Sequence, residues 1–323
     1  MTIIALLGGL VALVAGAEGI VRYGTRLAER LGVSPLLVGL TVVSVGTSAP
    51  ELAVGIQAMS RGEGSLVLGN LSGSNMVNLL LVLGLAAVFR PVVLQRQTLR
   101  LDLPAMVLSS VLVLLLSFDG ALSRWEGLVL LAVAVGYTAL LIRTARRQAG
   151  ARVAMTVESG MAEVLPAPDP RAVAVDLVLL VIGIAVVVVG ADWLVRGAVG
   201  IAVLFGVSES LIGLTVVAIG TSLPELATTI SALIRHNHHI AVGNLIGSST
   251  YNLTFVLGTS LLSGPGVVGL DPVLVRVDLP LMVAAVLLCI PVFVIGRRIT
   301  RPEGVLFVVV YAGYLTYLIA LRS

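Results

Sequence analysis

Two short segments of the sequence place a carboxylate, two hydroxyls and a proline in the same order. Gly-Thr-Ser-Ala-Pro-Glu occupies positions 46–51, and Gly-Thr-Ser-Leu-Pro-Glu occupies positions 220–225. Proline has no N–H to give the carbonyl four residues earlier, so a helix through either segment must kink or break. Freed carbonyls, hydroxyls and carboxylates are ligands of hard cations such as Na⁺ and Ca²⁺. The candidate ligands are Gly46, Thr47, Ser48, Glu51, Gly220, Thr221, Ser222 and Glu225.

A stripe of polar residues follows each segment at a spacing of four. The two stripes are Asn70, Ser74 and Asn78, and Asn244, Ser248 and Asn252. Residues four and eight apart lie on one face of a helix. These side chains could serve only as hydrogen-bonding contacts between helices, or they could line a site. We expect Ser74, Asn78, Ser248 and Asn252 to line the site formed by the two segments.

The composition excludes a water-soluble protein. Of the 323 residues, 58% are hydrophobic and 11% are charged, whereas soluble domains carry about 25% charged residues. All 20 basic residues are Arg and lie between apolar runs without forming a continuous basic face, which argues against nucleic acid as a partner. The single cysteine, Cys289, excludes an internal disulfide.

Ten apolar segments are long enough to cross about 30 Å of hydrocarbon. The predicted spans are residues 2–21, 35–60, 65–89, 102–118, 125–142, 173–195, 209–234, 240–263, 279–296 and 303–321. The polar segment between the fifth and sixth spans contains two adjacent Arg residues and three prolines, which predict a connecting loop. The sequence therefore predicts an all-α membrane protein with five spans on each side of this loop.

The two halves of the chain are copies of one another. Residues 32–84 align without a gap with residues 206–258, at an offset of 174, and 29 of the 53 positions are identical. Because each copy holds an odd number of spans, the copies must insert with opposite topology. Many secondary transporters are built from such inverted repeats, with the site near the membrane midplane. The predicted domains are a first five-helix repeat (1–142), a cytoplasmic loop (143–172) and a second five-helix repeat (173–323).

The distribution of Arg predicts the orientation of the chain. The connections after the first, third, fifth, seventh and ninth spans hold 15 of the 20 Arg residues. Positive charge is retained on the cytoplasmic side. We therefore expect a multi-pass protein of the cell membrane with both termini outside and the central loop in the cytoplasm.

Glu51 and Glu225 have no basic partner in their own spans. A charged side chain at mid-membrane costs about 2.5–3.5 kcal/mol on insertion scales. A bound or exchangeable cation would supply the missing charge. Alternatively, each Glu is protonated and hydrogen-bonded to a neighbouring helix. The recurrence of both residues behind the same Gly-Thr-Ser-x-Pro favours the cation.

Other polar residues are interpreted as structural. Glu18 and Arg22, like Asp192 and Arg196, are acid–Arg pairs four residues apart near helix ends. The histidines after the seventh predicted span are expected in a solvated turn, with pH sensing or metal binding as the alternative. These histidines are His236, His238 and His239. Cys289 is expected to be a small apolar core residue.

The duplicated motifs resemble those of a known family. The pair GTSAPEL and GNLSGSNMVN, repeated as GTSLPEL and GNLIGSSTYN, is similar to the alpha-repeats of the sodium/calcium exchanger family, within the calcium/cation antiporter superfamily. This resemblance implies that Glu51 and Glu225 are the central cation-binding carboxylates. It also implies that the first and sixth helices are the moving pair and that the same site is lined by hydroxyl and amide residues, namely Thr47, Ser48, Thr221, Ser222, Ser74, Asn78, Ser248 and Asn252. Some family members carry Asp at the position of Asn252, and its absence here argues against potassium co-transport.

The function expected from these observations is Na⁺/Ca²⁺ antiport by alternating access. A Ca²⁺/H⁺ antiporter of the same fold is the alternative, although such relatives usually carry Gly-Asn-Ala-x-Glu at the motif. A passive channel could also use carboxylates and a broken helix. An enzyme is not expected, because neither Ser48 nor Ser222 has a His or Lys in its span to act as a base. The expected partners are the transported cations and membrane lipids, with no cofactor; the oligomeric state, the stoichiometry and the choice among divalent cations stay open.

Overall fold

The computed structural model describes residues 2–158, 169–204 and 218–322, and most of these residues are helical. In the first half of the chain the elements are α1 (Thr2–Arg30), α2 (Pro35–Val38), η1 (Gly39–Val43), α3 (Ser44–Thr47), α4 (Ala49–Ser60), α5 (Gly64–Met76), η2 (Val77–Val82), α6 (Leu83–Phe89), β1 (Val92–Val93), η3 (Thr98–Asp102), α7 (Leu103–Leu116), β2 (Ala121–Ser123) and α8 (Arg124–Glu158). The label η marks a π-helical turn, in which hydrogen bonds span five residues.

The second half repeats much of this order. Its elements are α9 (Pro170–Leu204), α11 (Ala218–Thr221), α12 (Leu223–Ile234), α13 (His238–Tyr251), η5 (Asn252–Val256), α14 (Leu257–Ser263), β3 (Val267–Gly269), η6 (Leu274–Asp278), α15 (Leu279–Gly296), β4 (Arg298–Ile299) and α16 (Arg301–Arg322). Both halves interrupt a long helix with a π-helical turn, at η2 and at η5. The sequence repeat is therefore also a repeat of local structure.

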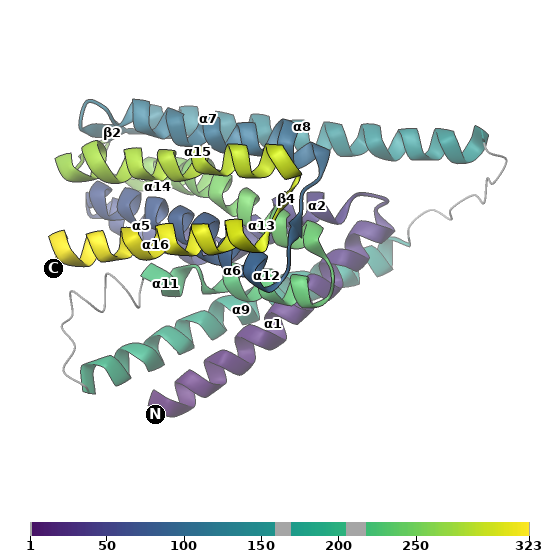
Figure 1. The fold of residues 1–323 in the computed structure, drawn as a ribbon, viewed down its shortest axis with the longest axis horizontal. Coiled ribbons are helices and arrows are strands. Elements are labelled where there is room, and N and C mark those ends of the chain that lie inside the picture. Colours follow the sequence, from purple (N-terminus) through teal and green to yellow (C-terminus); the bar gives the residue numbers. More distant parts are fainter. Residues whose placement is uncertain (1, 159–168, 205–217, 323) are drawn as a thin grey trace.

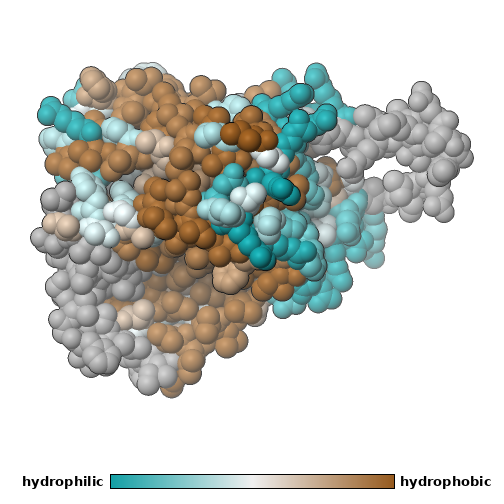
Figure 2. All heavy atoms as spheres, in the orientation of Figure 1, coloured by the Kyte–Doolittle hydropathy of each residue, from teal (hydrophilic) through white to brown (hydrophobic). Residues whose placement is uncertain are grey.

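Among the described residues, six helices are long and apolar enough to cross a membrane, and a bent pair makes seven. The other three of the ten predicted spans stay predictions. One of these, 209–234, is described only from α11 onward, and its residues 209–217 lie outside the described part of the chain. Figure 2 shows the broad hydrophobic surface of the bundle, with many hydrophilic residues gathered toward the end where β4 lies.

The helix over residues 35–60 breaks where the proline predicts it. The two parts, Pro35–Thr47 and Ala49–Ser60, meet at an angle of 44°. The break falls at Ser48, whose ψ of 10° is not helical, and Pro50 lies in the first turn of the second part. The same break separates α11 from α12 at Ser222, where ψ is 5°. In both copies the motif therefore spans the break, and its glutamate lies in the first turn of the new helix.

The segment 143–172, predicted as a loop, is helical up to Glu158, so that part of the prediction is wrong, whereas the division of the chain at this segment stays a prediction. α8 continues from the predicted span through Glu158, and residues 159–168 lie outside the described residues. The segment 143–158 is rich in Ala and Arg, which are good helix formers, and holds no proline. Helix propensity therefore outweighs the polar composition that suggested a loop. Pro170 begins α9 at a position where its missing N–H costs nothing.

The pairing predicted between Glu18 and Arg22 is also wrong. Glu18 forms an ion pair with Arg235, which ends α12, rather than with a residue of its own helix. Asp192 and Arg196 form the predicted pair, with Nε and Oδ2 2.8 Å apart. The spacing of residues along α1 cannot predict that Glu18 pairs with Arg235, which lies 217 positions later in the chain.

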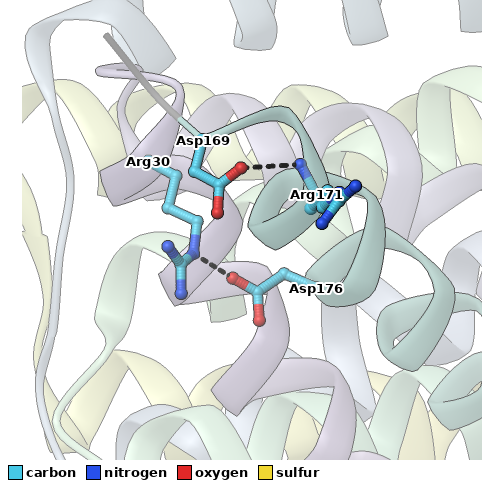
Figure 3. Close-up of polar contacts among 4 residues, drawn as sticks. All are labelled: Arg30, Asp169, Arg171 and Asp176. Carbon is cyan, nitrogen blue, oxygen red and sulfur yellow. Dashed lines mark hydrogen bonds and ion pairs between the residues drawn. The ribbon is translucent and has the colours of Figure 1, made fainter. Parts of the chain in front are cut away.

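α1 and α9 lie side by side and run obliquely to the other helices (Figure 1). An added Cβ at Gly9 would lie 2.7 Å from the carbonyl oxygen of Gly190, and one at Gly16 would lie 2.8 Å from that of Gly183. Only glycine allows the two backbones to approach so closely. At one end of the interface, Arg30 of α1 forms an ion pair with the buried Asp176 of α9 (Figure 3). The two helices are therefore joined along their length.

Two short antiparallel sheets connect the halves of the chain. β1 pairs with β4, with Val92 opposite Ile299, and β2 pairs with β3, with Leu122 opposite Val268. The early strand of each half therefore pairs with the late strand of the other half. This exchange is the pattern expected when two copies are related by a twofold axis.

The glycine contacts between α1 and α9 can be tested with a matched pair of substitutions. Gly16→Ala places a methyl group 2.7 Å from the backbone N of Val187, whereas the nearest such atom at Gly19 is 3.7 Å away. Overpacking costs about 1–3 kcal/mol, so we expect Gly16→Ala to lower the thermal unfolding temperature in detergent. Gly19→Ala should leave this temperature unchanged or raise it. Equal destabilisation by both variants would contradict a close backbone contact at Gly16.

Candidate cation-binding site

The two helix breaks place two acidic residues in the interior of the protein. Glu51 lies in the first turn of α4 and Glu225 in the first turn of α12. Both side chains are fully buried. The amino end of a helix carries partial positive charge, which favours a carboxylate there. This partial charge does not replace a full counter-charge, so the site still requires cationic partners.

Glu51 is contacted by residues from both halves of the chain. The Ser74 hydroxyl in α5 donates a hydrogen bond to Glu51 Oε1 over 3.3 Å. The same hydroxyl lies 3.5 Å from Thr221 Oγ1, at the end of α11. The motif of the second half therefore reaches the carboxylate of the first half through Ser74.

Glu225 is likewise contacted by a residue of the other half of the chain. The Ser48 hydroxyl, at the break of the first half, donates to Glu225 Oε1 over 3.3 Å. Thr47 Oγ1 donates to Asn244 Oδ1 over 3.1 Å and lies 3.4 Å from Ser248 Oγ. The contact between Thr47 and Ser248 is the repeat counterpart of that between Thr221 and Ser74. The two motifs thus interleave around one site.

The two carboxylates are linked through Ser48, which donates to Glu225 and lies three positions before Glu51 in the chain. Among the described residues, the ion pairs involve other acids, so neither Glu51 nor Glu225 has a basic partner. The second oxygen of each carboxylate, Oε2, is buried without a hydrogen-bond partner among those residues. Two buried acids held near each other in this way require cations or protons.

Further oxygens of the candidate site are also without partners in the described part of the chain. They are Ser222 Oγ, Asn78 Oδ1 and Asn252 Oδ1. Asn78 lies in η2 and Asn252 begins η5, so the last residue of each polar stripe lies in a π-helical turn. Gly46 and Gly220 lie beside the breaks, and an added Cβ would approach Ile184 and Val195 of α9 to 2.5 Å and 2.3 Å. These glycines therefore allow α9 to pack against both motifs.

Asn75, which belongs to neither polar stripe, contacts residues of the second half beside the candidate site. Its Nδ2 donates to the Ser249 carbonyl over 3.0 Å, and its Oδ1 accepts from Asn252 Nδ2 over 3.3 Å. Asn75 and Ser249 occupy equivalent positions of the repeat, at the offset of 174. Two polar residues at equivalent positions inside predicted spans are the feature of the sequence from which this contact could be predicted. Asn75 orients the amide of Asn252 rather than facing the carboxylates directly.

The composition of the site limits the ions it can hold. No group of three or more His, Cys, Asp or Glu forms within the described ranges. The candidate ligands are two carboxylates together with hydroxyl and amide oxygens. Oxygen donors suit hard cations, and Ca²⁺ takes six to eight of them in protein sites. The carboxylate, hydroxyl and amide oxygens of this set are donors that suit Ca²⁺ or Na⁺.

Comparison with known proteins agrees with this chemistry. The sequence model of the family described as "Sodium/calcium exchanger protein" matches residues 1–143 and 175–320. The chain belongs to this family. It is thus a multi-pass membrane protein of a transporter family and not an enzyme.

Individual relatives cover nearly the whole chain. A putative antiporter, CaxA, from Alkalimonas amylolytica is 37% identical over 95% of both chains. The sodium/calcium exchanger MaX1 from Methanosarcina acetivorans is 32% identical over 97% of both chains. A solved structure of the sodium–calcium exchanger NCX_Mj superposes with a TM-score of 0.83 at 29% identity, covering 100% of this chain and 99% of that one.

The positioning contact of Asn75 gives a test. Asn75→Leu leaves the Asn252 amide buried without its acceptor, which costs about 1–3 kcal/mol. We expect a lower thermal unfolding temperature and a smaller stabilisation by added Ca²⁺ than in the wild type. Gln57→Leu, which removes an exposed amide from α4, is the control and should change neither quantity. Undiminished stabilisation of Asn75→Leu by Ca²⁺ would show that Asn75 does not position the site.

Proposed function

We propose that the chain exchanges Na⁺ for Ca²⁺ across the cell membrane by alternating access to one central site. The proposed ligands are Glu51, Glu225, Thr47, Ser48, Thr221, Ser222, Ser74, Asn78, Ser248, Asn252, Gly46 and Gly220. One observation carries the proposal: two fully buried carboxylates, interleaved with hydroxyl and amide oxygens of both repeats, have no basic partner among the described residues. The ions are cargo, and the mechanism needs no cofactor.

The charge of the site accounts for exchange. With both carboxylates ionised the site carries two negative charges, which one Ca²⁺ neutralises and two or three Na⁺ match or slightly exceed. An ion-loaded site can be enclosed away from water, whereas an empty one with two uncompensated charges is costly to enclose. The transporter therefore changes its accessible side only when loaded. Inward flow of Na⁺ would then drive Ca²⁺ outward.

We further propose ten transmembrane helices arranged as two inverted five-helix repeats, residues 1–142 and 173–323, joined by the cytoplasmic segment 143–172. The exchanged pairing of β1 with β4 and β2 with β3 supports a twofold relation between the halves. The bias of Arg toward one set of connections supports both termini outside. α1 and α9 are the proposed moving pair, and their continuous glycine-lined contact supports movement as one body.

Transport in proteoliposomes tests the proposed activity. Na⁺-loaded vesicles should take up Ca²⁺ only when external Na⁺ is low. A hydrogen bond to a charged group contributes about 1.5–3 kcal/mol, and a contact between a carboxylate and a cation should contribute at least as much. We therefore expect Glu51→Gln and Glu225→Gln each to reduce uptake at least tenfold. Glu63→Gln, which changes an exposed acid in the α4–α5 connection, is the matched control. Uptake that ignores the Na⁺ gradient but follows a pH gradient without sodium would replace Na⁺ by H⁺ as the coupling ion.

The proposed topology is tested by labelling. Cys289 is the only cysteine, so Cys289→Ala gives a cysteine-free background. In that background Glu63→Cys, after α4, should react with a membrane-impermeant maleimide in intact cells. Leu31→Cys, after α1, should react only after the membrane is permeabilised. The opposite pattern would reverse the orientation without affecting the exchange proposal.

A further inference from the structure

The two halves of the chain do not make equivalent contacts with the α1–α9 pair. α1 packs along α12, the helix that carries Glu225. In the described residues α9 makes little or no contact with α4, which is the equivalent helix of the first half. Since the sequences are copies, the structure corresponds to one of two arrangements that the repeat allows.

An ion pair marks the contact that is formed. Glu18 of α1 pairs with Arg235, the C-cap residue of α12. Both side chains are about half exposed, at 53% and 41%. Between these helices lies an apolar groove of about 500 Å³, which Glu18 and Arg235 close at one end. A hydrogen bond from Asn237 Nδ2 to Thr25 Oγ1, 2.8 Å long, adds a second polar contact at this end of α1.

The repeat supplies the same two charges on the other side. At the offset of 174, Glu18 corresponds to Asp192 and Arg235 corresponds to Arg61. Arg61 is the C-cap residue of α4, as Arg235 is of α12. Asn237 and Thr25 correspond to Glu63 and Val199, so the neighbouring hydrogen bond is not duplicated. Both copies therefore carry the acidic and the Arg residue of the ion pair, whereas the residues of the hydrogen bond are not repeated.

The second pair is not formed in this structure. Asp192 instead pairs with Arg196 of its own helix. Arg61 is exposed and makes no ion pair with any described residue. Asp192 and Arg61 could therefore pair with each other in a second arrangement, in which α9 packs against α4.

We propose that Glu18–Arg235 and Asp192–Arg61 are alternating ion pairs, each of which holds the α1–α9 pair in one of the two access states. In the proposed topology Arg235 is cytoplasmic and Arg61 external. Glu18–Arg235 then closes the cytoplasmic side, and Asp192–Arg61 closes the external side. This inference rests on the proposed function, because it assigns the two states to alternating access.

The first test uses cross-linking, which does not depend on transport. In the Cys289→Ala background, Glu18→Cys with Arg235→Cys and Arg61→Cys with Asp192→Cys are treated with a short, reducible dithiol linker. Both pairs should cross-link in membranes, and each cross-link should block exchange until it is reduced. A 61–192 pair that never cross-links would overturn the proposal. Cross-linking of both pairs in a protein without Na⁺/Ca²⁺ exchange would preserve the two states and reject the proposed function.

The second test measures the balance of the states. A half-exposed ion pair shifts an equilibrium by up to about fivefold, and apparent affinity follows the populated fraction of the competent state. Glu18→Gln should therefore weaken the apparent external Ca²⁺ affinity by up to about fivefold, and Asp192→Asn should strengthen it. The reversal Glu18→Arg with Arg235→Glu should restore the wild-type value, and Arg22→Gln should not change it. Shifts in the same direction for Glu18→Gln and Asp192→Asn, or no restoration by the reversal, would reject an alternating role.

Discussion

The site depends on two carboxylates, Glu51 and Glu225, that are buried without a basic partner among the described residues. A membrane protein could neutralise Glu51 or Glu225 with an Arg from a neighbouring helix, as it neutralises Asp176 with Arg30. Around the two glutamates the described part of the chain supplies neutral oxygens, among them the hydroxyls of Ser48 and Ser74, and no basic side chain. The missing charge must then come from mobile cations or protons. The helix breaks, the π-helical turns and the glycines beside α9 all serve to bring these oxygens together.

Much of this site could be predicted from the sequence. Pro50 and Pro224 identify the breaks because a prolyl ring cannot continue the hydrogen bonding of a helix. The spacing of Asn70, Ser74 and Asn78 identifies a single face because the helical period is fixed. The duplication then indicates that both copies serve one purpose. These inferences concern residues near one another in the chain, where local geometry is decisive.

Contacts between the halves could not be predicted in the same way. The partner of Glu18 is Arg235, and Asn75 joins Ser249 and Asn252, because two copies pack against each other with a particular offset and angle. Periodicity contains no information about that packing. The continuation of α8 to Glu158 was missed for another reason. Polar composition argues against a membrane span, but it does not argue against a helix that extends beyond the membrane.

The remaining differences between the copies decide how symmetric the transport cycle can be. If the repeats were identical, the two access states would have equal energies in a symmetric environment. Buried hydroxyls break this equality: Thr229 and Ser260 of the second half correspond to Gly55 and Ala86 of the first. Ser260 Oγ lies 2.4 Å from where a Cβ at Gly55 would stand, so the two positions already touch in this state. In the proposed cycle the halves exchange roles, and these hydroxyls would then exchange surroundings with groups that cannot form hydrogen bonds. The intrinsic preference for one state therefore has a physical origin in a few unmatched side chains, in addition to the ions that the site holds.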